Sequence, residues 1–451
     1  MRLLYLVHQF PPQFTTGTEI LALESARAVQ ALGHEVEILT AELVDSPPPG
    51  NAPASTDVYQ GIRVHRYPYY QPNPLPGCSP HRAEYNNART QDYLRGALEA
   101  FRPDIVHAFH LYRLSAAAFE TIADSGIPLI FSVTDFWPVC PAIDLRLPDG
   151  AICAGPRRNS SNCLRHLCGE ERWRRTSLLP SVFLEWWARR IETGHAPGSP
   201  MAEKDHAAAL ILRQSYLRRM LPKARILITP SRVVRRKLTA FGIREAQMRH
   251  LPFGINIDYI KDAPPKTSSA RLRIGYIGTL SRPKGLQVLA GAFRELPPDL
   301  AVELKIYGRS TDDPVFCQEM ERMLAGDNRV AFLGAFPNPQ IGEVLAGLDV
   351  LVVPSIWLEN TPLVISTAQA ARVPVIASDL DGMSELIEHG VNGLLFPVGD
   401  QSALARCLRQ LASDPAALAR LVAASRQPRS IKEYASELNA IYCSVAAGKG
   451  A

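Results

Sequence analysis

Short apolar segments recur along the first half of the chain and alternate with segments whose apolar residues follow a helical spacing. The strand-like segments are RLLYLV (2–7), HEVEILT (34–40), GIRVHRYPYY (61–70), IPLIFSVTDF (127–136) and RILITPS (225–231). The segment FRPDIVHAFH (101–110) ends a helix and enters a further strand. After the first of the strand-like segments, Leu21, Ala28 and Leu32 share one face of a predicted amphipathic helix that ends at Gly33. Strands that alternate with helices predict a parallel sheet covered on both faces.

The same alternation restarts after a polar stretch, DYIKDAPPKTSSA at 258–270, which indicates an interdomain linker. The next expected elements, between 271 and 379, are the helix LQVLAGAFREL and the strands RLRIGYIGTL, AVELKIYGRS, RVAFLGAF, LDVLVVPS and VPVIASD. The sequence therefore predicts an α/β protein with two successive doubly wound, Rossmann-like domains. No G-x-G-x-x-G fingerprint follows the first strand, so a dehydrogenase finds no support there.

Composition narrows the class of protein. Hydrophobic residues make up 46% and charged residues 21% of the 451 residues, which is typical of a globular chain. No apolar run reaches the roughly 18 residues of a membrane helix, and the start MRLLYLVHQF is interpreted as a core strand rather than a signal peptide. We therefore expect a cytoplasmic protein whose eight cysteines form no disulfide framework.

The net charge of +5 is concentrated in one segment. Between Trp137 and Lys223 there are 14 lysines and arginines against 8 aspartates and glutamates, whereas the rest of the chain is nearly balanced. Because the excess is local, we expect no nucleic-acid partner.

The most informative segment runs from 354 to 397. Glu359 and Asn360 follow the predicted strand LDVLVVPS and precede a predicted helix that Thr361 and Pro362 open. Proline suits the first helical position because its missing N–H costs nothing there. The free N–H groups of such a helix start favour an anion such as a diphosphate. A carboxylate beside them is costly without a task, and contact with a sugar hydroxyl would be one.

At these residues the chain resembles glycosyltransferase family 4, the retaining nucleotide-sugar transferases of GT-B fold. The family signature is a Glu, seven residues and a second Glu, found here around PSIW-EN-PLV. Glu359 fills the first place, which in the family lies against the donor sugar. Thr367 stands in the second place, where the family's Glu binds the ribose hydroxyls. A threonine hydroxyl can bond a ribose, but less strongly than a charged acceptor.

The resemblance covers most of the chain and implies a GT-B architecture, in which two Rossmann-like domains face a cleft. The expected parts are an acceptor-side domain over 1–262, a nucleotide-sugar-binding domain over 263–430, and a final helix over 431–451 that packs back on the first domain. The resemblance fails over about 137–222, which is interpreted as an insertion in the first domain.

Two basic residues of the loop GTLSRPKG, at 278–285, are candidates for binding the donor diphosphate. Lys284 matches the family's lysine, whereas Thr279 stands at the family's arginine and Arg282 is the candidate to replace it. Both cations would offset the charge on the departing diphosphate, although a solvated basic turn is the alternative. Tyr307, at the end of the next strand, would stack on the nucleotide base or lie in the core.

Backbone groups complete the donor site that the resemblance implies. The helix start supplies Asn360, Thr361, Pro362 and Leu363. DGMSE matches the family's Gly-Gly-x-x-Glu with Asp381 at the first glycine, so N–H groups at Gly382 and Met383 would meet the sugar or phosphate; a plain glycine turn is the alternative. In TTGTE, Gly17 is the candidate for close backbone approach, and Glu19 is interpreted as a first-turn helix charge.

Two histidines, His107 and His110, lie near the end of a predicted strand, where open parallel sheets place their ligands. The family carries a histidine here that approaches the donor sugar. Of the two, His110 is favoured as a catalytic residue beside Glu359, with a structural role as the alternative. Asp135, after the next strand, is the candidate for acceptor binding.

The insertion holds two further patterns. Its cysteines, Cys140, Cys153, Cys163 and Cys168, cluster around His166 and leave structural zinc, disulfides and free thiols as alternatives. Its segment 171–190 interleaves Trp173, Trp186 and Trp187 with Arg172, Arg174, Arg175, Arg189 and Arg190. That composition suits an anionic membrane surface, or else a helical subdomain whose aromatic residues pack on the first domain.

These observations predict a retaining glycosyltransferase that moves a sugar from a nucleotide-sugar to an unidentified acceptor. A lipid-linked or cell-surface glycan is suggested by the basic, Trp-rich insertion. The resemblance implies that catalysis requires no cofactor. Two alternatives stay open. One is a non-catalytic nucleotide-sugar-binding or scaffold protein, because Thr367 and Thr279 replace charged family residues; the other is a GT-B-fold nucleotide-sugar epimerase.

Overall fold

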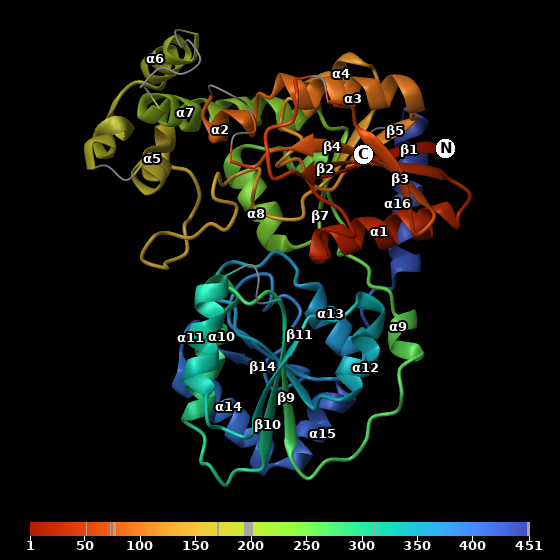
Figure 1. The fold of residues 1–451 in the computed structure, drawn as a ribbon, viewed down its shortest axis with the longest axis vertical. Coiled ribbons are helices and arrows are strands. Elements are labelled where there is room, and N and C mark those ends of the chain that lie inside the picture. Colours follow the sequence, from red (N-terminus) through yellow and green to blue (C-terminus); the bar gives the residue numbers. More distant parts are fainter. Residues whose placement is uncertain are drawn as a thin grey trace. The chain divides into compact units, whose positions relative to one another are not determined.

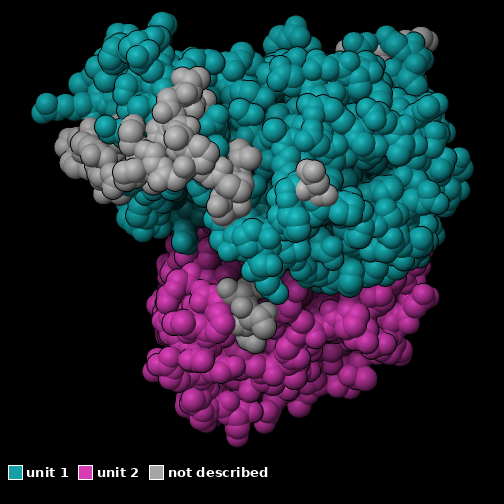
Figure 2. All heavy atoms as spheres, turned by 45° about the horizontal axis from the view of Figure 1, so that its top comes forward, with its two compact units in different colours: residues 1–252, 432–451 teal, residues 253–431 magenta. Residues whose placement is uncertain are grey.

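The computed structural model describes residues 1–50, 52–72, 74, 78–168, 171–193, 202–309 and 313–448, with the backbone alone for 171–174, 192–193 and 202–203. The chain forms two compact units, coloured separately in Figure 2. Unit 1 comprises residues 1–252 and 432–451, and unit 2 comprises residues 253–431. The polypeptide therefore leaves unit 1 once and returns to it.

Unit 1 is built on one sheet, whose strand order among the described residues is β3-β4-β2-β1-β5-β6-β7-β8. All neighbouring strands are parallel except β3 and β4. The strands are β1 (Arg2–Val7), β2 (Glu35–Leu43), β3 (Ser55–Tyr59), β4 (Ile62–Tyr69), β5 (Ile105–Ala108), β6 (Leu129–Ser132), β7 (Ile226–Thr229) and β8 (Met248–His250). Successive residues of β1 are buried, so both faces of the sheet are covered at its centre.

The helices of unit 1 cover this sheet and continue into the insertion. They are α1 (Gly17–Gln30), α2 (Pro80–Ala83), α3 (Ala88–Phe101), α4 (Ala118–Asp124), α5 (Ser161–Cys168), α6 (Ser181–Thr193), α7 (Ala202–Met220), α8 (Arg232–Phe241) and α16 (Ile431–Ala446). The 3-10 helices are η1 (Arg158–Ser160), η2 (Glu171–Leu178), η3 (Leu221–Lys223) and η4 (Glu245–Gln247).

The expected insertion forms a group of helices in which α7 contacts α5, α6 and α2 (Figure 1). Arg213 of α7 connects this group to the rest of unit 1 through two hydrogen bonds. Its Nε donates to Glu84 Oε2 over 2.9 Å, and its Nη2 donates to the Trp137 carbonyl over 2.6 Å. Both bonds are buried, so the guanidinium charge is paired where water is excluded.

The last helix, α16, belongs to unit 1 and reaches the centre of its sheet. The Tyr442 hydroxyl lies 2.9 Å from the Tyr5 hydroxyl and 2.6 Å from His107 Nδ1, while His107 Nε2 lies 2.8 Å from the Ser132 hydroxyl. Burial lowers the pKa of His107 to about 3, so the imidazole is neutral. His107 is thus a buried core residue.

Unit 2 has a parallel sheet with the strand order β11-β10-β9-β12-β13-β14 in the described residues. The strands are β9 (Leu272–Ile277), β10 (Val302–Tyr307), β11 (Val330–Gly334), β12 (Val350–Val353), β13 (Val375–Ser378) and β14 (Gly393–Phe396). The helices are α9 (Asp258–Lys261), α10 (Leu286–Arg294), α11 (Pro314–Leu324), α12 (Ile341–Ala346), α13 (Leu363–Ala370), α14 (Gln401–Ser413), α15 (Pro415–Ala423), η5 (Arg282–Lys284) and η6 (Asn338–Gln340).

Unit 2 begins at Phe253, earlier than the expected 263. The Ile255 N–H donates to the Arg429 carbonyl over 3.1 Å, and the Ile431 N–H donates to the Ile255 carbonyl over 2.7 Å. A Cβ added to Gly342 would lie 2.0 Å from the Tyr259 carbonyl oxygen, so α9 packs closely on α12. Part of the polar stretch expected as a linker is therefore packed structure of unit 2.

Other differences from the expected elements are local. Helix α1 ends at Gln30, so Leu32 lies beyond it and is 47% exposed, because the chain turns there toward β2. The short strands β3, β8 and β14 were not expected. The first has an exposed, polar edge and the last is short and glycine-led, so neither shows a long alternating pattern.

Candidate active site

Glu359 lies in the loop between β12 and α13 and is only 7% exposed. Its Oε1 accepts three hydrogen bonds, from Lys284 Nζ (2.8 Å), the Ser355 hydroxyl (2.8 Å) and Trp357 Nε1 (2.7 Å). Its other oxygen, Oε2, receives no hydrogen bond from the described residues. Three donors on one oxygen fix the carboxylate and leave the second oxygen to accept from a ligand.

Lys284, at the end of η5, is held beside Glu359 by its own loop. Its Nζ also lies 4.9 Å from the centre of the Trp357 ring, a cation–π geometry. Gly285 follows with φ +78°, and a Cβ there would lie 1.8 Å from the Pro354 carbonyl oxygen. The Ile356 N–H donates to the Pro283 carbonyl over 2.9 Å. The loops after β9 and β12 are therefore joined directly through their backbones.

These two loops meet at the topological switch point of unit 2. In the strand order of this sheet, β9 and β12 are neighbours, and the chain proceeds in opposite directions from them. Open parallel sheets bind ligands outside the carboxyl ends of the strands at such a point. The Lys284–Glu359 pair thus lies at the edge of the sheet where proteins of this fold bind their ligands.

A third loop approaches the same residues. Gly382 has φ +86°, and a Cβ there would lie 2.1 Å from the Glu359 carbonyl oxygen and 2.6 Å from that of Asn360. Met383 is completely buried in the core. The N–H groups of Met383 and Ser384 donate to the Leu380 carbonyl over 3.1 and 2.9 Å. Of this segment, Gly382 is therefore the part that the structure brings to Glu359, and Met383 supports the turn.

Helix α13 begins beside Glu359. Pro362 occupies its N-cap position, no described side chain caps it, and Leu363 is its first residue. Thr361 donates from its hydroxyl to Asn360 Oδ1 over 3.4 Å. Thr367 donates its hydroxyl to the Leu363 carbonyl over 2.8 Å, one turn back in the helix. The uncapped start of α13 carries the positive end of the helix dipole toward the Lys284–Glu359 pair.

Of two further predicted donor residues, Arg282 points away from Glu359 and Tyr307 packs in part on the core. Arg282 is half exposed, and its Nη2 lies 2.5 Å from Glu319 Oε2, with the guanidinium over the Phe316 ring. It pairs with α11 rather than joining Lys284 at Glu359. The Tyr307 ring stands edge-on to Phe336, with centroids 5.5 Å apart, and partial burial raises its pKa. It is half buried at the strand end, so one part of the ring packs and the other faces solvent.

In unit 1, His110 follows β5, which is the neighbour of β1 at the switch point of that sheet. His110 Nε2 is bonded to Asp135 Oδ2, and the Tyr112 N–H donates to Nδ1 over 3.0 Å. Because Nδ1 accepts that bond, the ring proton sits on Nε2 and faces Asp135. The structure therefore brings His110 and Asp135 together.

Residues that the sequence analysis missed surround this pair. The His8 ring packs on His110 with centroids 4.1 Å apart, and burial together with the charge of Arg113 lowers its pKa well below the usual value. Glu19 is completely buried and accepts from Gln9 Nε2 over 2.8 Å, while Gln9 Oε1 accepts from Arg113 Nη1 over 2.6 Å. The signal in the sequence was that His8 directly follows the first strand.

Gly17 and Glu19 frame the start of α1. Glu19 forms a capping box with Thr16, accepting from its N–H over 2.9 Å, so its role exceeds that of a surface helix charge. Gly17 is exposed, and a Cβ there would meet nothing within 4 Å. No contact inside unit 1 explains the glycine, which leaves room for a ligand to approach the backbone.

Zinc, one of the three alternatives for the clustered cysteines, finds no support in the described residues. Within them, no group of three or more His, Cys, Asp or Glu side chains is arranged to hold a metal ion, and the cysteines form no disulfide. Burial raises the pKa of Cys140 to about 11 and that of Cys163 to about 12, so both are neutral thiols when no metal is bound. Cys153 accepts from Asn162 Nδ2 over 3.4 Å, and Cys168 lies at the end of α5.

The residues of the Trp- and Arg-rich segment are described in part. The side chains of Arg172, Trp173 and Arg174 lie outside the described residues. In α6, Leu184 and Ala188 are buried, whereas Val182, Phe183 and Trp186 are 80%, 51% and 56% exposed. Among the helices described, none is long and apolar enough to cross a membrane.

Two doubly wound units, one with a lysine, a carboxylate and a helix start at its switch point, define a glycosyltransferase of GT-B fold. Sucrose-phosphate synthase from Thermosynechococcus elongatus superposes with a TM-score of 0.69 at 17% identity, covering 99% of both chains. Anabaena HepE, solved with UDP-glucose, gives a TM-score of 0.63 at 16% identity and covers 98% of this chain and 100% of HepE. At these identities the likeness establishes the fold.

The chain belongs to glycosyltransferase family 4, whose model matches residues 15–259; a model described as "Glycosyl transferases group 1" matches residues 271–414. It is 29% identical to a phosphatidyl-myo-inositol mannosyltransferase of Mycobacterium leprae over 58% of this chain and 71% of that protein. It is also 29% identical to the amylovoran biosynthesis glycosyltransferase AmsK of Erwinia amylovora, over 46% of this chain and 52% of AmsK. The matched parts thus span between about half and 71% of these relatives.

Proposed function

We propose that this glycosyltransferase is a retaining enzyme that takes a sugar from a nucleotide-sugar bound by unit 2. The observation that carries the proposal is the pairing of Lys284 with Glu359 beside the uncapped start of α13. A cation and a helix start together suit a diphosphate, and a fixed carboxylate oxygen suits a sugar hydroxyl. Family membership favours transfer over the binder and epimerase alternatives.

In this proposal, Lys284 and the N–H groups at the start of α13 hold the diphosphate. Glu359 Oε2 accepts a hydrogen bond from a hydroxyl of the donor sugar, with Gly382 close behind it. The bond between the anomeric carbon and the diphosphate oxygen breaks as Lys284 stabilises the charge that develops on that oxygen. The acceptor oxygen bonds to the anomeric carbon from the same face, and its proton passes to the departing diphosphate. The proposed steps involve no metal ion.

Relatives support the classes of substrate. HepE was solved with UDP and with UDP-glucose, and similar chains include a phosphatidyl-myo-inositol mannosyltransferase and D-inositol 3-phosphate glycosyltransferases. We infer a nucleotide-sugar donor and a polyol or glycan acceptor, which a lipid anchor would carry. In unit 1, His110 with Asp135, and the open backbone at Gly17, are the residues proposed to face the reacting sugar and the acceptor.

A thermal-shift panel of nucleoside diphosphates and nucleotide-sugars tests the donor site. One nucleotide should raise the melting temperature, since a ligand at 100 times its Kd adds about 2.7 kcal/mol to folding stability. The shift should vanish in Lys284→Ala and persist in Lys261→Ala, which removes an exposed lysine of the same unit that pairs with Asp258. No shift with any nucleotide would overturn the donor assignment.

We also propose that the exposed face of α6 contacts an anionic membrane, where a lipid-linked acceptor would be found. Val182, Phe183 and Trp186 share this face, and Arg189 and Arg190 continue it by one turn at exposed positions. Exposed aromatic and aliphatic side chains next to arginines match the headgroup region of anionic lipids. Leu184 and Ala188, on the opposite face of the helix, are buried.

Sedimentation with lipid vesicles tests this face. Binding should require phosphatidylglycerol in phosphatidylcholine vesicles, weaken with salt, and fall in Trp186→Ala and Phe183→Ala. Val58→Ala is the matched control, because Val58 is 70% exposed on β3, away from this helix. Equal binding by all three variants, or binding that ignores phosphatidylglycerol, would contradict the proposal.

A further inference from the structure

Arg113 is a buried cation of unit 1 that has no carboxylate partner among the described residues. It lies in the loop between β5 and α4, shortly after His110, and is only 9% exposed. Its Nη1 donates to Gln9 Oε1 over 2.6 Å, and its Nε donates to Gln71 Oε1 over 3.2 Å. Both acceptors are neutral amides. Its Nη2 donates to no described residue, so one end of the guanidinium is available to another group.

The other buried arginines show what Arg113 lacks. Among the described residues four arginines are buried, and each of the other three contacts a carboxylate. These pairs are Arg66–Asp57 (2.6 Å), Arg213–Glu84 (2.9 Å) and Arg273–Asp349 (3.0 Å). Proteins pair buried charges because taking a charge out of water is costly. Arg113 departs from a rule that the described chain otherwise follows.

One buried carboxylate, Glu19, acts on Arg113 from a distance. Glu19 Oε1 accepts from Gln9 Nε2 over 2.8 Å, and Oε2 accepts from the Thr16 N–H over 2.9 Å and from the Thr16 hydroxyl. Both oxygens are thus engaged by Gln9 and by the start of α1. Because the Gln9 amide lies between Glu19 and Arg113, the two charges do not have the direct contact of the other three pairs.

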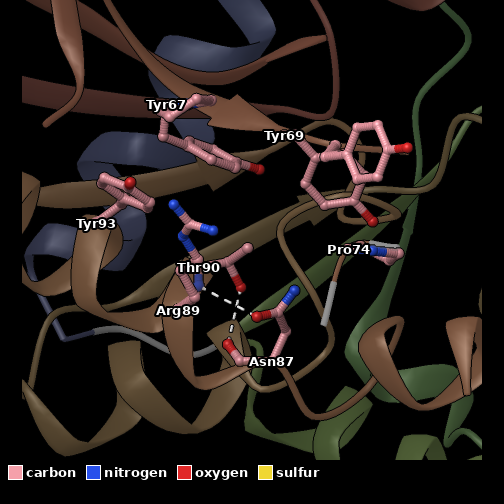
Figure 3. Close-up of a pocket in the computed structure, with 9 residues that line it drawn as sticks. Tyr67, Tyr69, Pro74, Asn87, Arg89, Thr90 and Tyr93 are labelled. Carbon is pink, nitrogen blue, oxygen red and sulfur yellow. Dashed lines mark hydrogen bonds between the residues drawn. The ribbon is translucent and has the colours of Figure 1, made fainter. Parts of the chain in front are cut away.

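The tyrosines around Arg113 supply no negative charge. Tyr67 and Tyr69 interact electrostatically with Arg113 and line a small pocket at the end of β4 (Figure 3). Burial raises the pKa of both hydroxyls, so they keep their protons and are neutral. The pocket has room for about one water molecule, and no carboxylate lines it. Water accepts hydrogen bonds from a guanidinium but does not neutralise its charge.

The surroundings of Arg113 disfavour its charge and fix its position. Burial lowers the pKa of the Arg113 guanidinium, whereas the hydrogen bond to Asp349 raises the pKa of Arg273. Two amides hold the Arg113 side chain, and its Cζ lies 5.2 Å from the centre of the Phe14 ring, a cation–π geometry. A fixed guanidinium with an open end suits the oxygens of a phosphate or a carboxylate.

The residues of this cluster come from three loops at one edge of the sheet. Gln9 follows β1, Gln71 follows β4 and Arg113 follows β5, so all three lie at the carboxyl edge that also carries His110. We propose that Arg113 binds an oxyanion group of the acceptor, a phosphate or a carboxylate, and that the acceptor is therefore anionic. The assignment to the acceptor rests on the proposed function, whereas the anion site itself does not.

Calorimetric titration with inorganic phosphate, at constant ionic strength, tests the anion site. The titrations use the Lys284→Ala background, which weakens phosphate binding at the proposed donor site. We expect saturable binding whose Kd rises about tenfold or more in Arg113→Gln. Gln71→Glu should also weaken phosphate binding, because it places a carboxylate against Arg113 Nε, and it should not lower the melting temperature.

The matched control is Arg95→Gln. Arg95 is an exposed arginine of unit 1 that pairs with Asp92, so its replacement removes the same charge and should leave phosphate affinity unchanged. Melting temperatures in phosphate-free buffer provide a second readout. Arg213→Gln takes the arginine away from the buried carboxylate of Glu84, so it should lower the melting temperature more than Arg113→Gln does. Equal losses would mean that Arg113 has a counter-charge within the protein, and would contradict the proposal.

Glycerol 3-phosphate and glucose 6-phosphate, titrated beside glycerol and glucose, separate a free ion from a group on the acceptor. Tighter binding of either ester than of inorganic phosphate, lost in Arg113→Gln, supports an anionic acceptor. Esters that bind no more tightly than phosphate indicate a site for a free ion and overturn the assignment to the acceptor.

Phosphate binding that is absent, or equally strong in Arg113→Gln and the parent, overturns the anion site. These titrations do not require sugar transfer or a nucleotide. A failure of the proposed donor site, seen in the nucleotide thermal-shift panel, is therefore distinguishable from a failure of this one.

Discussion

At the scale of single residues, neighbours on one loop take different partners. Lys284 pairs with Glu359, whereas Arg282 does not. It lies two residues from Lys284, yet its guanidinium is over Phe316 and pairs with Glu319 of another helix. The sequence places a side chain on a loop, but the packing of neighbouring helices decides its direction. His8 and Arg113 were missed for the same reason, since their partners are distant in the sequence.

Replacement of Glu359 by glutamine should abolish most of the transfer activity and leave the fold intact. The amide keeps the size of the side chain but loses the charge that binds Lys284 and the sugar hydroxyl, which should lower kcat on the order of 10²-fold. Initial rates with the donor found in the thermal-shift panel would measure this. Glu319→Gln is the control, because Glu319 pairs with Arg282 outside the site. Equal rates for Glu359→Gln and the parent would remove Glu359 from the mechanism.

Gly382→Ala should destabilise unit 2 and weaken nucleotide binding. Two costs combine: positive φ, of about 1 kcal/mol, and a Cβ that would lie 2.1 Å from the Glu359 carbonyl oxygen. Gly399→Ala separates them, because Gly399 has φ +76° and a Cβ there would meet nothing within 4 Å. Denaturant unfolding should show the larger loss for Gly382→Ala. Equal losses of unfolding free energy in the two variants would mean that the loop carrying Gly382 can move away from Glu359.

At the scale of elements, the buried strands β9 to β13 were predictable from their apolar runs, whereas the strand order of unit 2 and its sixth strand, β14, were not. The role of Glu19 was harder to predict. The capping box of α1 has a recognisable sequence, but its burial depends on Gln9 and Arg113. The clustering of the insertion cysteines left zinc, disulfides and free thiols as alternatives, whereas the described residues show no metal-binding group there. Tertiary surroundings decide such roles, and they are absent from the local sequence.

The pairing of α16 with His107 predicts a dependence of stability on pH. Above pH 6.5 the imidazole is neutral in both states. Below pH 6.5, His107 binds a proton in the unfolded chain, whereas in the folded chain it stays neutral down to about pH 3. The free energy of unfolding therefore falls, as the pH is lowered through this window, by up to about 1.4 kcal/mol per pH unit. His107→Gln should flatten that part of the curve in urea unfolding. His389→Gln, at an exposed histidine, is the control. An unchanged slope in His107→Gln would refute the assignment.

At the scale of the whole molecule, unit 1 depends on a segment that follows unit 2 in the sequence. Tyr434, Leu438 and Tyr442 of that segment are completely buried. A chain that ends at 431 should lose more than about 5 kcal/mol of unit 1 stability, because each of these side chains contributes about 1.5–3 kcal/mol. Hydrogen exchange should show the loss in β1 and β5 but not in unit 2. A chain that ends at 446 is the control, and equal protection in both would contradict this.

The path of the chain also orders events during synthesis. Unit 2 is continuous, so all of it has been made before the residues that complete unit 1 appear. At ~5–20 residues per second, residues 253–431 take roughly 10–40 s to translate. Throughout that interval the Tyr5 hydroxyl and the His107 imidazole lack Tyr442, their hydrogen-bond partner in the complete chain. The centre of the first sheet of a nascent chain therefore stays incomplete for that whole interval, during which a chaperone would find exposed apolar surface to bind.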